Sequence, residues 1–352
     1  MKRLLIPICF SILSIQAFAQ ATNCAQTLRL AQSVYDQGRL HELEDIINKG
    51  LAGGDCDKQT KVNLYKLLTL AYIYLEEPQK ADGSMLKLLQ TDHYFEINEA
   101  VDPAEFVALY NTFRTREIYR VGARLGVNAS QPNVVNSVTA VELAGDSEYK
   151  DGVAIHFGGV VDVPLNDKMT LHGELLYLQK KFELDLKVDR GDADGKPLGQ
   201  EFQGFETQNY ISLPLSFEYK IADKKYNPFV AGGFSIDYLL SDKMKAERVR
   251  ADEAAIPETT FDLKPLRENI NISALVGAGV KLKMGGGYFI AEVRYIYGIT
   301  NVNSTETAFA NQQATWDQGY ADPVFKVTSL AVSGTYVLNV FNPKKNKIKI
   351  SQ

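Results

Sequence analysis

Two histidines and a glutamate occupy positions that could support acid–base chemistry. His156, His172 and Glu174 share the polar side of two segments whose apolar and polar residues alternate, as in a β-strand with two unlike faces. A histidine beside a carboxylate can activate a serine nucleophile in a hydrolase. No serine motif accompanies these residues, so we expect both histidines to belong to a structural charge network. We predict that the chain is not an enzyme.

The segment RGDADGKPLGQE (190–201) has a spacing of carboxylates close to that of a calcium loop. Asp192, Asp194 and Glu201 fall where positions 3, 5 and 12 of such a loop would be. Position 1 is an arginine instead of a carboxylate, and no helices flank the segment, so we expect a solvated loop. No CxxC or Cys/His cluster has metal-ligand spacing. The sequence therefore predicts no metal site and no cofactor.

Eight charged residues lie on the same small-residue face as the histidines. They need partners if that face is buried, because an isolated buried charge is expensive. We predict that they form a salt-bridged network inside a barrel and leave no continuous water channel. The expected members are Arg120, Arg124, Glu174, Glu218, Asp237, Lys281, Glu292 and Arg294.

The stretch ISLPLSFEY (211–219) indicates which face is the interior. Leu213 and Leu215 alternate with Ser212 and Ser216. Glycine, alanine and serine fill the polar face of other segments too, and such small side chains suit the narrow interior of an eight-stranded barrel. A soluble barrel would instead hold bulky apolar residues inside, so we expect the apolar face to contact lipid. The proline of this stretch donates no ladder hydrogen bond, and we expect a local bulge there.

Alternation of this kind recurs in eight segments, at about 118–130, 150–164, 168–188, 203–221, 226–242, 267–283, 287–302 and 324–341. Short connections alternate with long ones near 131–149, 189–202, 243–266 and 303–323. This is the layout of an up-and-down transmembrane barrel, with short turns on the periplasmic side. We expect a closed, eight-stranded, antiparallel outer-membrane β-barrel over residues 117–342. Its expected interfacial aromatic residues are Tyr119, Tyr219, Tyr238, Tyr288, Tyr297, Tyr336 and Phe341.

Residues 20–116 have helical periodicity instead. We expect helices within 22–38, 40–51, 61–76, 80–90 and 101–114, the fourth interrupted by Gly83. The first four resemble two tetratricopeptide units, each an antiparallel helix pair. The sequence therefore predicts a periplasmic α-helical domain of tetratricopeptide-like (TPR-like) type before the barrel.

Cys24 and Cys56 remain in the mature chain and suit an oxidising compartment. Antiparallel helices bring the start of the first helix beside the end of the second, which places these two cysteines together. A disulfide closing this roughly 33-residue loop would contribute about 3–4 kcal/mol in the chain-entropy model. The alternative is two unpaired cysteines.

The two ends of the chain carry positive charge. Lys2 and Arg3 precede an apolar run that ends in a small-residue cleavage pattern, so we expect residues 1–19 to be a secretory signal peptide. No other apolar run approaches the roughly 18 residues of a membrane helix. Residues 343–352 contain four lysines and are expected to be a basic, solvated tail.

Composition excludes two other classes. The chain has 352 residues and a net charge of -5, so it has no charge signature of a nucleic-acid binder. Its mean hydropathy of -0.17 argues against a helical membrane protein.

Four segments of the second half resemble successive strands of the PorT-like outer-membrane β-barrel family. They are LHGELLYLQKKF (171–182), NYISLPLSFEYKI (209–221), PFVAGGFSIDYLL (228–240) and AEVRYIYGITNV (291–302). The resemblance covers roughly residues 118–341 and implies an eight-stranded outer-membrane barrel of a Gram-negative bacterium. Some members of that family serve type IX secretion and gliding machinery.

The expected function is non-enzymatic. The barrel would sit in outer-membrane lipid and anchor the helical domain, which would bind a periplasmic protein partner, for example one in an envelope or secretion assembly. Three alternatives are a surface adhesin or receptor acting through the long loops, a small pore, and a barrel lipid hydrolase that uses the two histidines.

Overall fold

The computed structural model describes residues 24–52, 56–138, 148–191, 197–222, 226–250, 256–318 and 320–346. It divides into two units, of which the smaller contains residues up to Glu117 together with the chain from Phe341, and the larger is Ile118–Val340. The expected signal peptide, residues 1–19, lies outside the described residues. No helix in the described part of the chain is both long and apolar enough to cross a membrane.

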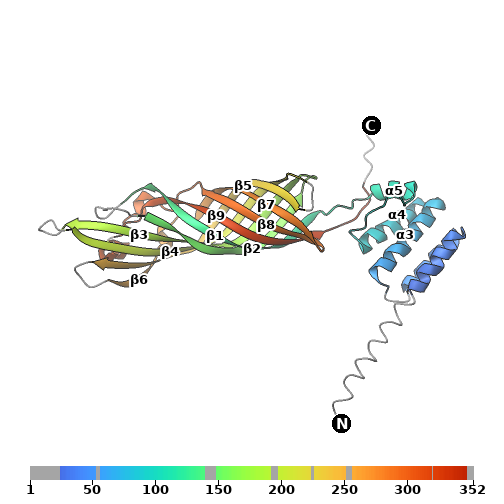
Figure 1. Ribbon diagram of the computed structural model, residues 1–352, viewed down its shortest axis with the longest axis horizontal. Coiled ribbons are helices and arrows are strands. Elements are labelled where there is room, and N and C mark those ends of the chain that lie inside the picture. Colours follow the sequence, from blue (N-terminus) through green and yellow to red (C-terminus); the bar gives the residue numbers. More distant parts are fainter. Residues whose placement is uncertain are drawn as a thin grey trace, which may run out of the picture. The chain divides into compact units, whose positions relative to one another are not determined.

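The larger unit is a closed antiparallel ring of eight strands (Figure 1). Each strand pairs with its neighbours in the chain, β4 pairs with β5, and the first strand pairs with the last over the full length of both. A ninth strand, β6 (Ile256–Asp262), pairs only with the last part of β5, from Lys243 to Arg248, and is not part of the ring. The ring strands are β1 (Tyr119–Asn136), β2 (Glu148–Pro164), β3 (Met169–Gly191), β4 (Pro197–Lys220), β5 (Tyr226–Arg250), β7 (Ile270–Met284), β8 (Gly287–Gly298) and β9 (Val324–Val340).

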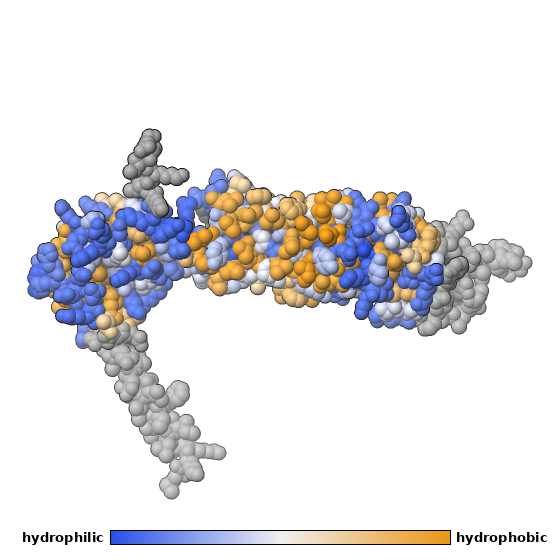
Figure 2. Space-filling model, turned by 180° about the vertical axis from the view of Figure 1, so that it is seen from behind, coloured by the Kyte–Doolittle hydropathy of each residue, from blue (hydrophilic) through white to orange (hydrophobic). Residues whose placement is uncertain are grey.

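The ring confirms the expected eight-stranded barrel, and each alternating segment of the sequence lies on one of its strands. The alternation also gives the correct faces. Leu213 and Phe217 point outward and are 51% and 54% exposed, whereas Ser212 and Ser216 point inward and are buried. Apolar side chains gather on the outside of the barrel in the same way along the other strands (Figure 2).

The outward apolar band on β4 runs from Ile211 to Tyr219, nine residues. A tilted transmembrane strand needs about 9–11 residues. The band therefore matches the thickness of a bilayer, and the rest of this long strand extends beyond it.

Beyond the band the two faces of β3 exchange character. In the lower half Leu175 points outward, and Glu174 points inward. In the upper half Lys181 points outward, and Phe182 and Leu184 are buried inside. Aromatic and aliphatic side chains of β3, β4, β5 and β6 form a buried apolar core at this end, as in a water-soluble sheet. The long-loop end thus carries its own folded β structure.

This extension corrects the expected loops. Segments 189–202 and 243–266 are largely strand, because β3, β4 and β5 continue into them and β6 lies inside the second. Residues 303–323 contain two short helical elements, η3 (Thr305–Thr307) and α6 (Gln312–Gln318), and η2 (Lys264–Leu266) precedes β7. Asp192 and Asp194 of the calcium-like segment lie outside the described residues, and Glu201 lies in β4.

Three local expectations were wrong. The pairing of β4 shows no register shift at Pro214; the ladder to β3 is interrupted beside it, and the shift lies between Asn209 and Tyr210. Tyr288 points into the barrel, where the Arg120 guanidinium stacks 4.9 Å from its ring centre. Phe341 belongs to the helical unit and not to an interfacial girdle.

The smaller unit contains a helix over residues 24–36 and five more elements in sequence. They are η1 (Leu40–Glu42) running into α2 (Leu43–Ala52), then α3 (Lys58–Tyr74), α4 (Pro78–Thr91) and α5 (Ala104–Asn111). The first helix is followed by a turn at Gly38, whose positive φ of 74° allows the chain to reverse. Helix α4 runs through Gly83 without the expected interruption.

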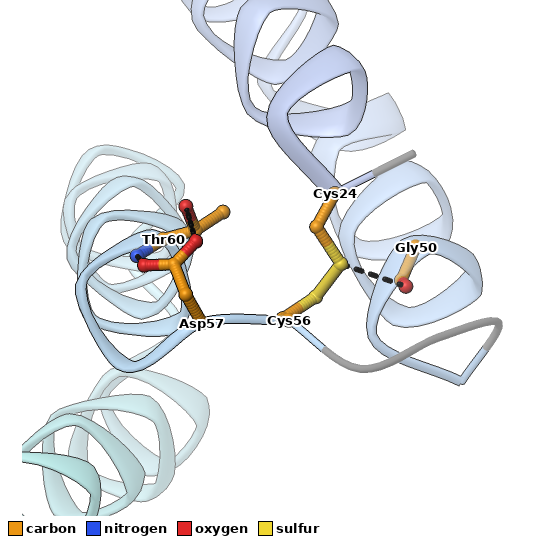
Figure 3. The surroundings of a disulfide bond; sticks show 5 residues. All are labelled: Cys24, Gly50, Cys56, Asp57 and Thr60. Atoms are coloured by element: carbon orange, nitrogen blue, oxygen red, sulfur yellow. Dashed lines mark hydrogen bonds between the residues drawn. A yellow bond between two sulfur atoms is a disulfide. The ribbon is translucent and has the colours of Figure 1, made fainter. Parts of the chain in front are cut away.

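Apolar residues of all five helices pack into two adjoining cores. Cys24 and Cys56 form a disulfide with Cα atoms 5.5 Å apart, which ties the start of the first helix to the segment before α3 (Figure 3). The next residue, Asp57, caps α3 by accepting a hydrogen bond of 2.9 Å from the Thr60 amide. The disulfide and the cap together fix Cys56 and Asp57, the residues that lead into α3.

Candidate functional site: the charged interior of the barrel

The interior of the ring accommodates long charged side chains because small residues face them. Gly277 pairs directly with Arg294 across β7 and β8, and Gly126 pairs with His156 across β1 and β2. A Cβ atom on Gly126 would lie 2.4 Å from His156 Nε2, so no larger residue fits there without movement. The small-residue face of the sequence is therefore the space that the charged side chains occupy.

Two arginines and two glutamates form the centre of the network. Arg124 donates to Glu292 at 2.6 Å and lies 3.3 Å from Glu174. Arg294 lies 2.7 Å from Glu174 and 3.0 Å from Glu292. Each arginine thus bridges both carboxylates, and all four side chains are buried. Such an arrangement satisfies charges that would be costly alone.

His172 extends this network toward the short-turn end of the barrel. Its Nε2 lies 2.8 Å from Glu174, and its Nδ1 contacts Asp162. Asp162 in turn lies 3.6 Å from Lys281 and 3.8 Å from Arg120. Held between two carboxylates and an arginine, His172 has the surroundings of a structural ion-pair partner.

The remaining predicted residues also point inward. Lys281 pairs with Glu218 at 2.7 Å and so joins the same network. Asp237 is separate: it lies 3.2 Å from Lys180 and accepts hydrogen bonds of 2.6 Å from Ser212 and Ser235. The structure thus places seven of the eight predicted residues in one connected network, and the eighth in a neighbouring cluster.

The network also contains His172, as expected, whereas two members of these clusters, Asp162 and Lys180, have no place in the predicted set. Both lie at inward positions of the alternating pattern, on β2 and β3. Counting every charged residue at such positions would have found both.

A second buried cluster, which the sequence reasoning missed, lies at the long-loop end. Arg267 is fully buried and contacts three carboxylates: Asp242 at 2.6 Å, Glu206 at 3.0 Å, and Asp322. Its guanidinium also lies 5.3 Å from the centre of the Phe325 ring. Glu206 and Asp242 are on ring strands, whereas Arg267 and Asp322 lie in the connections before β7 and β9. Arg267 therefore holds two of the long connections inside the mouth of the barrel.

Two cavities inside the described part of the barrel are small. A cavity of about 30 Å³ lies in mid-barrel beside His156 and Asn128, which has room for about two water molecules. His156 Nδ1 and Asn128 Oδ1 lack protein hydrogen-bond partners there. Another cavity of about 70 Å³ lies at the short-turn end beside Lys281 and Tyr288. Within the described residues, no group of three or more His, Cys, Asp or Glu side chains is placed to hold a metal ion.

A closed eight-stranded ring with a lipid-matched apolar exterior and a charged interior defines an outer-membrane β-barrel. The chain belongs to the outer membrane protein beta-barrel domain family, whose model matches residues 112–304. This family places the protein in the outer membrane.

Several solved structures are similar to this chain. Neisserial surface protein A is 12% identical, with a TM-score of 0.30, covering 63% of this chain and 96% of its own. The attachment invasion locus protein Ail of Yersinia pestis is 12% identical, with a TM-score of 0.26, covering 63% and 99%. OprG of Pseudomonas aeruginosa is 11% identical, with a TM-score of 0.27, covering 64% and 95%. No curated protein sequence matches the chain. Similarity at this level carries no information on function.

Proposed function

We propose that this protein is a non-enzymatic outer-membrane anchor for a periplasmic, TPR-like interaction domain. The observation that carries the proposal is the position of the two barrel ends. Tyr119, at the start of β1, pairs with Val340, at the end of β9. The segment that enters the ring and the segment that follows it are therefore both at the short-turn end. Short turns face the periplasm in bacterial barrels of this class. The helical unit then lies in an oxidising compartment, where its disulfide is stable.

The surface of the helical unit offers contact points for a protein partner. Leu30 on the first helix and Tyr74 on α3 are 53% and 50% exposed. Aromatic side chains are enriched in protein interfaces. The resemblance to PorT-like barrels suggests that this partner belongs to an envelope or secretion assembly of the type IX or gliding kind.

Site-specific cross-linking in intact cells tests this proposal. A photoreactive phenylalanine analogue at Leu30 or Tyr74 is expected to capture one defined periplasmic protein, identified by mass spectrometry. The matched control carries the analogue at Lys245, an exposed position beyond the apolar band on β5. Capture of the same proteins at all three positions, or cleavage of the helical unit by protease added outside intact cells, would contradict the proposal.

A second candidate function is recognition of a surface ligand at the long-loop end. The observation that favours it is the folded β structure beyond the apolar band, with its own buried core. A barrel that only anchored the helical unit would not need strands of this length. Pull-down of purified protein with host or surface ligands is expected to succeed only while this end is intact, and a Phe202→Asp variant, which disrupts its core, serves as the control.

The geometry favours the other two candidates less. A pore needs a continuous aqueous path, whereas charged side chains fill this interior. A barrel lipid hydrolase would need its histidines within reach of lipid, whereas His156 and His172 are buried inside the ring. If the protein is an enzyme nonetheless, His156→Ala and His172→Ala should abolish its activity on lipid substrates.

A further inference from the structure

The last described residues of the chain return to the helical unit. The Phe341 ring stacks on His93, with ring centres 5.3 Å apart, and meets the Tyr94 ring edge-on at 5.0 Å. Both partners follow the end of α4. Contacts with two other aromatic rings hold the Phe341 side chain in a defined position.

The backbone after Phe341 pairs with the segment that follows α5. The Arg114 amide donates to the Lys344 carbonyl at 2.9 Å, and the Asn346 amide donates to the Thr112 carbonyl at 2.8 Å. These bonds flank an antiparallel bridge between Phe113 and Lys345. Residues 341–346 therefore lie extended on the helical unit as a short added strand.

Charge supports the same placement. Lys345 Nζ lies 2.6 Å and 2.5 Å from the two carboxylate oxygens of Asp82 on α4. Residues 24–117 contain ten Lys and Arg against fifteen Asp and Glu, whereas residues 341–352 contain four Lys and no acidic residue. The basic segment thus lies on an acidic unit.

We infer that Asp82, His93, Tyr94 and the backbone of residues 112–114 form a peptide-binding site, called here the tail site, which the chain's own residues 341–346 occupy. It takes an extended segment with an aromatic residue followed four positions later by a lysine. Main-chain pairing supplies affinity and the side-chain seats supply specificity, as in other sites that bind an added strand. This site replaces the expectation of a solvated tail for residues 343–346; residues 347–352 lie outside the described part.

Occupation of the tail site depends on closure of the barrel. Val340 pairs with Tyr119 only when the last strand joins the first. That pairing delivers Phe341 to the start of β1, a few residues from Phe113. A tethered segment of this kind has an effective concentration of about 1 mM, so a site of modest intrinsic affinity is filled once the ring is complete.

The test uses the chain truncated after Val340, refolded in detergent, and a fluorescent synthetic peptide of sequence FNPKKNKIKISQ. Saturable binding with a dissociation constant below about 1 mM is expected from this effective concentration. The full-length chain, whose tail site is filled, should bind the peptide at least tenfold more weakly. A scrambled peptide of the same composition is the control for simple charge attraction. Equal binding of the scrambled peptide, or equal binding to both chains, would overturn the inference.

Two exchanges locate the binding. A peptide with alanine for Phe341 should bind about tenfold more weakly. A peptide with glutamate for Lys345 should bind weakly to the truncated chain and regain affinity when that chain carries Asp82→Lys. Loss of affinity without recovery in the exchanged pair would exclude the Asp82 contact.

Limited proteolysis of the full-length chain answers the same question if the truncated chain fails to fold. Trypsin should cut slowly after Lys344 and Lys345 in the parent, because their backbone is paired. In a Phe341→Ala variant, cutting at these bonds should be at least tenfold faster, as followed by mass spectrometry. Equal rates in the two chains would refute the tail site.

Discussion

Individual charged residues hold the interior of this barrel together. Each carboxylate at the centre of the network contacts two arginines, and each arginine contacts two carboxylates. Removing one member leaves its partners buried without compensation. That loss is costly, even though a fully apolar interior of the same volume could be equally stable.

We therefore expect Arg294→Leu and Arg124→Leu each to destabilise the barrel by about 3–5 kcal/mol, because Glu174 and Glu292 lose a partner. The measurement is the temperature at which the refolded barrel loses its heat-modifiable migration on a denaturing gel. Val293→Leu is the matched control, since this neighbour points outward toward lipid. If both arginine variants unfold at the parent temperature, the network does not stabilise the barrel.

Asp102 makes the helical unit sensitive to acid. Burial tends to raise the pKa of this carboxyl, but hydrogen bonds from Lys66 and from the Asn98 amide outweigh burial and lower the pKa. A carboxyl with a lowered pKa stabilises the folded state above its ordinary pKa of 3.8, and this contribution disappears as the pH falls through the lowered value.

Asp102→Asn should accordingly destabilise the helical unit by about 1–3 kcal/mol at pH 7, and by less at an acidic pH below the ordinary pKa of 3.8. Circular dichroism at 222 nm during denaturant unfolding of the full chain measures both values. Asp45→Asn, at an exposed position of α2, should change stability little at either pH. A constant difference between parent and Asp102→Asn across this range would show that the ion pair does not cause the acid sensitivity.

Whole strands set the boundary between the membrane and water. The outward residues of β4 before Ile211 are mostly polar, with Phe205 as an exception, whereas the inward residues of β3 change from charged to apolar at this end. One strand thus serves two environments with a single alternating pattern.

Matched substitutions on the outward face of β4 test that boundary. Leu213→Lys should cost about 2–4 kcal/mol of folding free energy in lipid vesicles. Thr207→Lys, on the same face but above the band, should cost less than about 0.5 kcal/mol. Urea titration of vesicle-reconstituted protein measures both, and similar costs at the two positions would contradict the placement of the band.

The disulfide acts on the helices as a group. A Cys24→Ser/Cys56→Ser chain should lose about 3–4 kcal/mol of helical-unit stability, because its unfolded state regains the freedom of a roughly 33-residue loop. Denaturant unfolding followed at 222 nm reports this loss. The parent treated with a reductant should match the double variant, and an unchanged midpoint in both would show that the bond adds no stability.

The sequence predicts the elements well wherever one period dominates. Strict alternation gives all eight ring strands and their faces, since burial on one side of a strand leaves that pattern. The missed extensions of β3, β4 and β5 also alternate, but their apolar side chains point inward and their polar side chains point outward. Because the sequence analysis expected apolar residues on the outer face, it assigned these extensions to polar loops. Asp322 could not be assigned to a cluster from local pattern, because a connection outside the regular strands brings it to Arg267.

At the scale of the whole molecule, the chain connects the helical unit and the barrel twice, between Glu117 and Ile118 and between Val340 and Phe341. Ion pairs occupy the lumen at several levels, and Arg267 holds two long connections inside its mouth. Within the described residues, ion-paired side chains thus fill much of the barrel interior.

We expect no steady ion conductance when the purified protein is reconstituted in planar bilayers. The physical reason is that the described cavities are separate and hold only a few waters. Single-channel recording makes the measurement, with a known eight-stranded pore as the positive control. Reproducible, steady openings would show that the interior network rearranges and that the protein is a pore.

The exchange of faces along β3, β4 and β5 also constrains how this protein can change in length. Deleting one residue of β3 at the end of the apolar band nearest the long loops would move every following side chain of that strand to the opposite face. Phe182 and Leu184 would then face water, while the lipid-facing half of the strand would be unchanged. Deleting two residues would keep each side chain on its face and would only shorten the part of the strand beyond the membrane. Natural variants of these strands should therefore differ by even numbers of residues, or carry a compensating bulge.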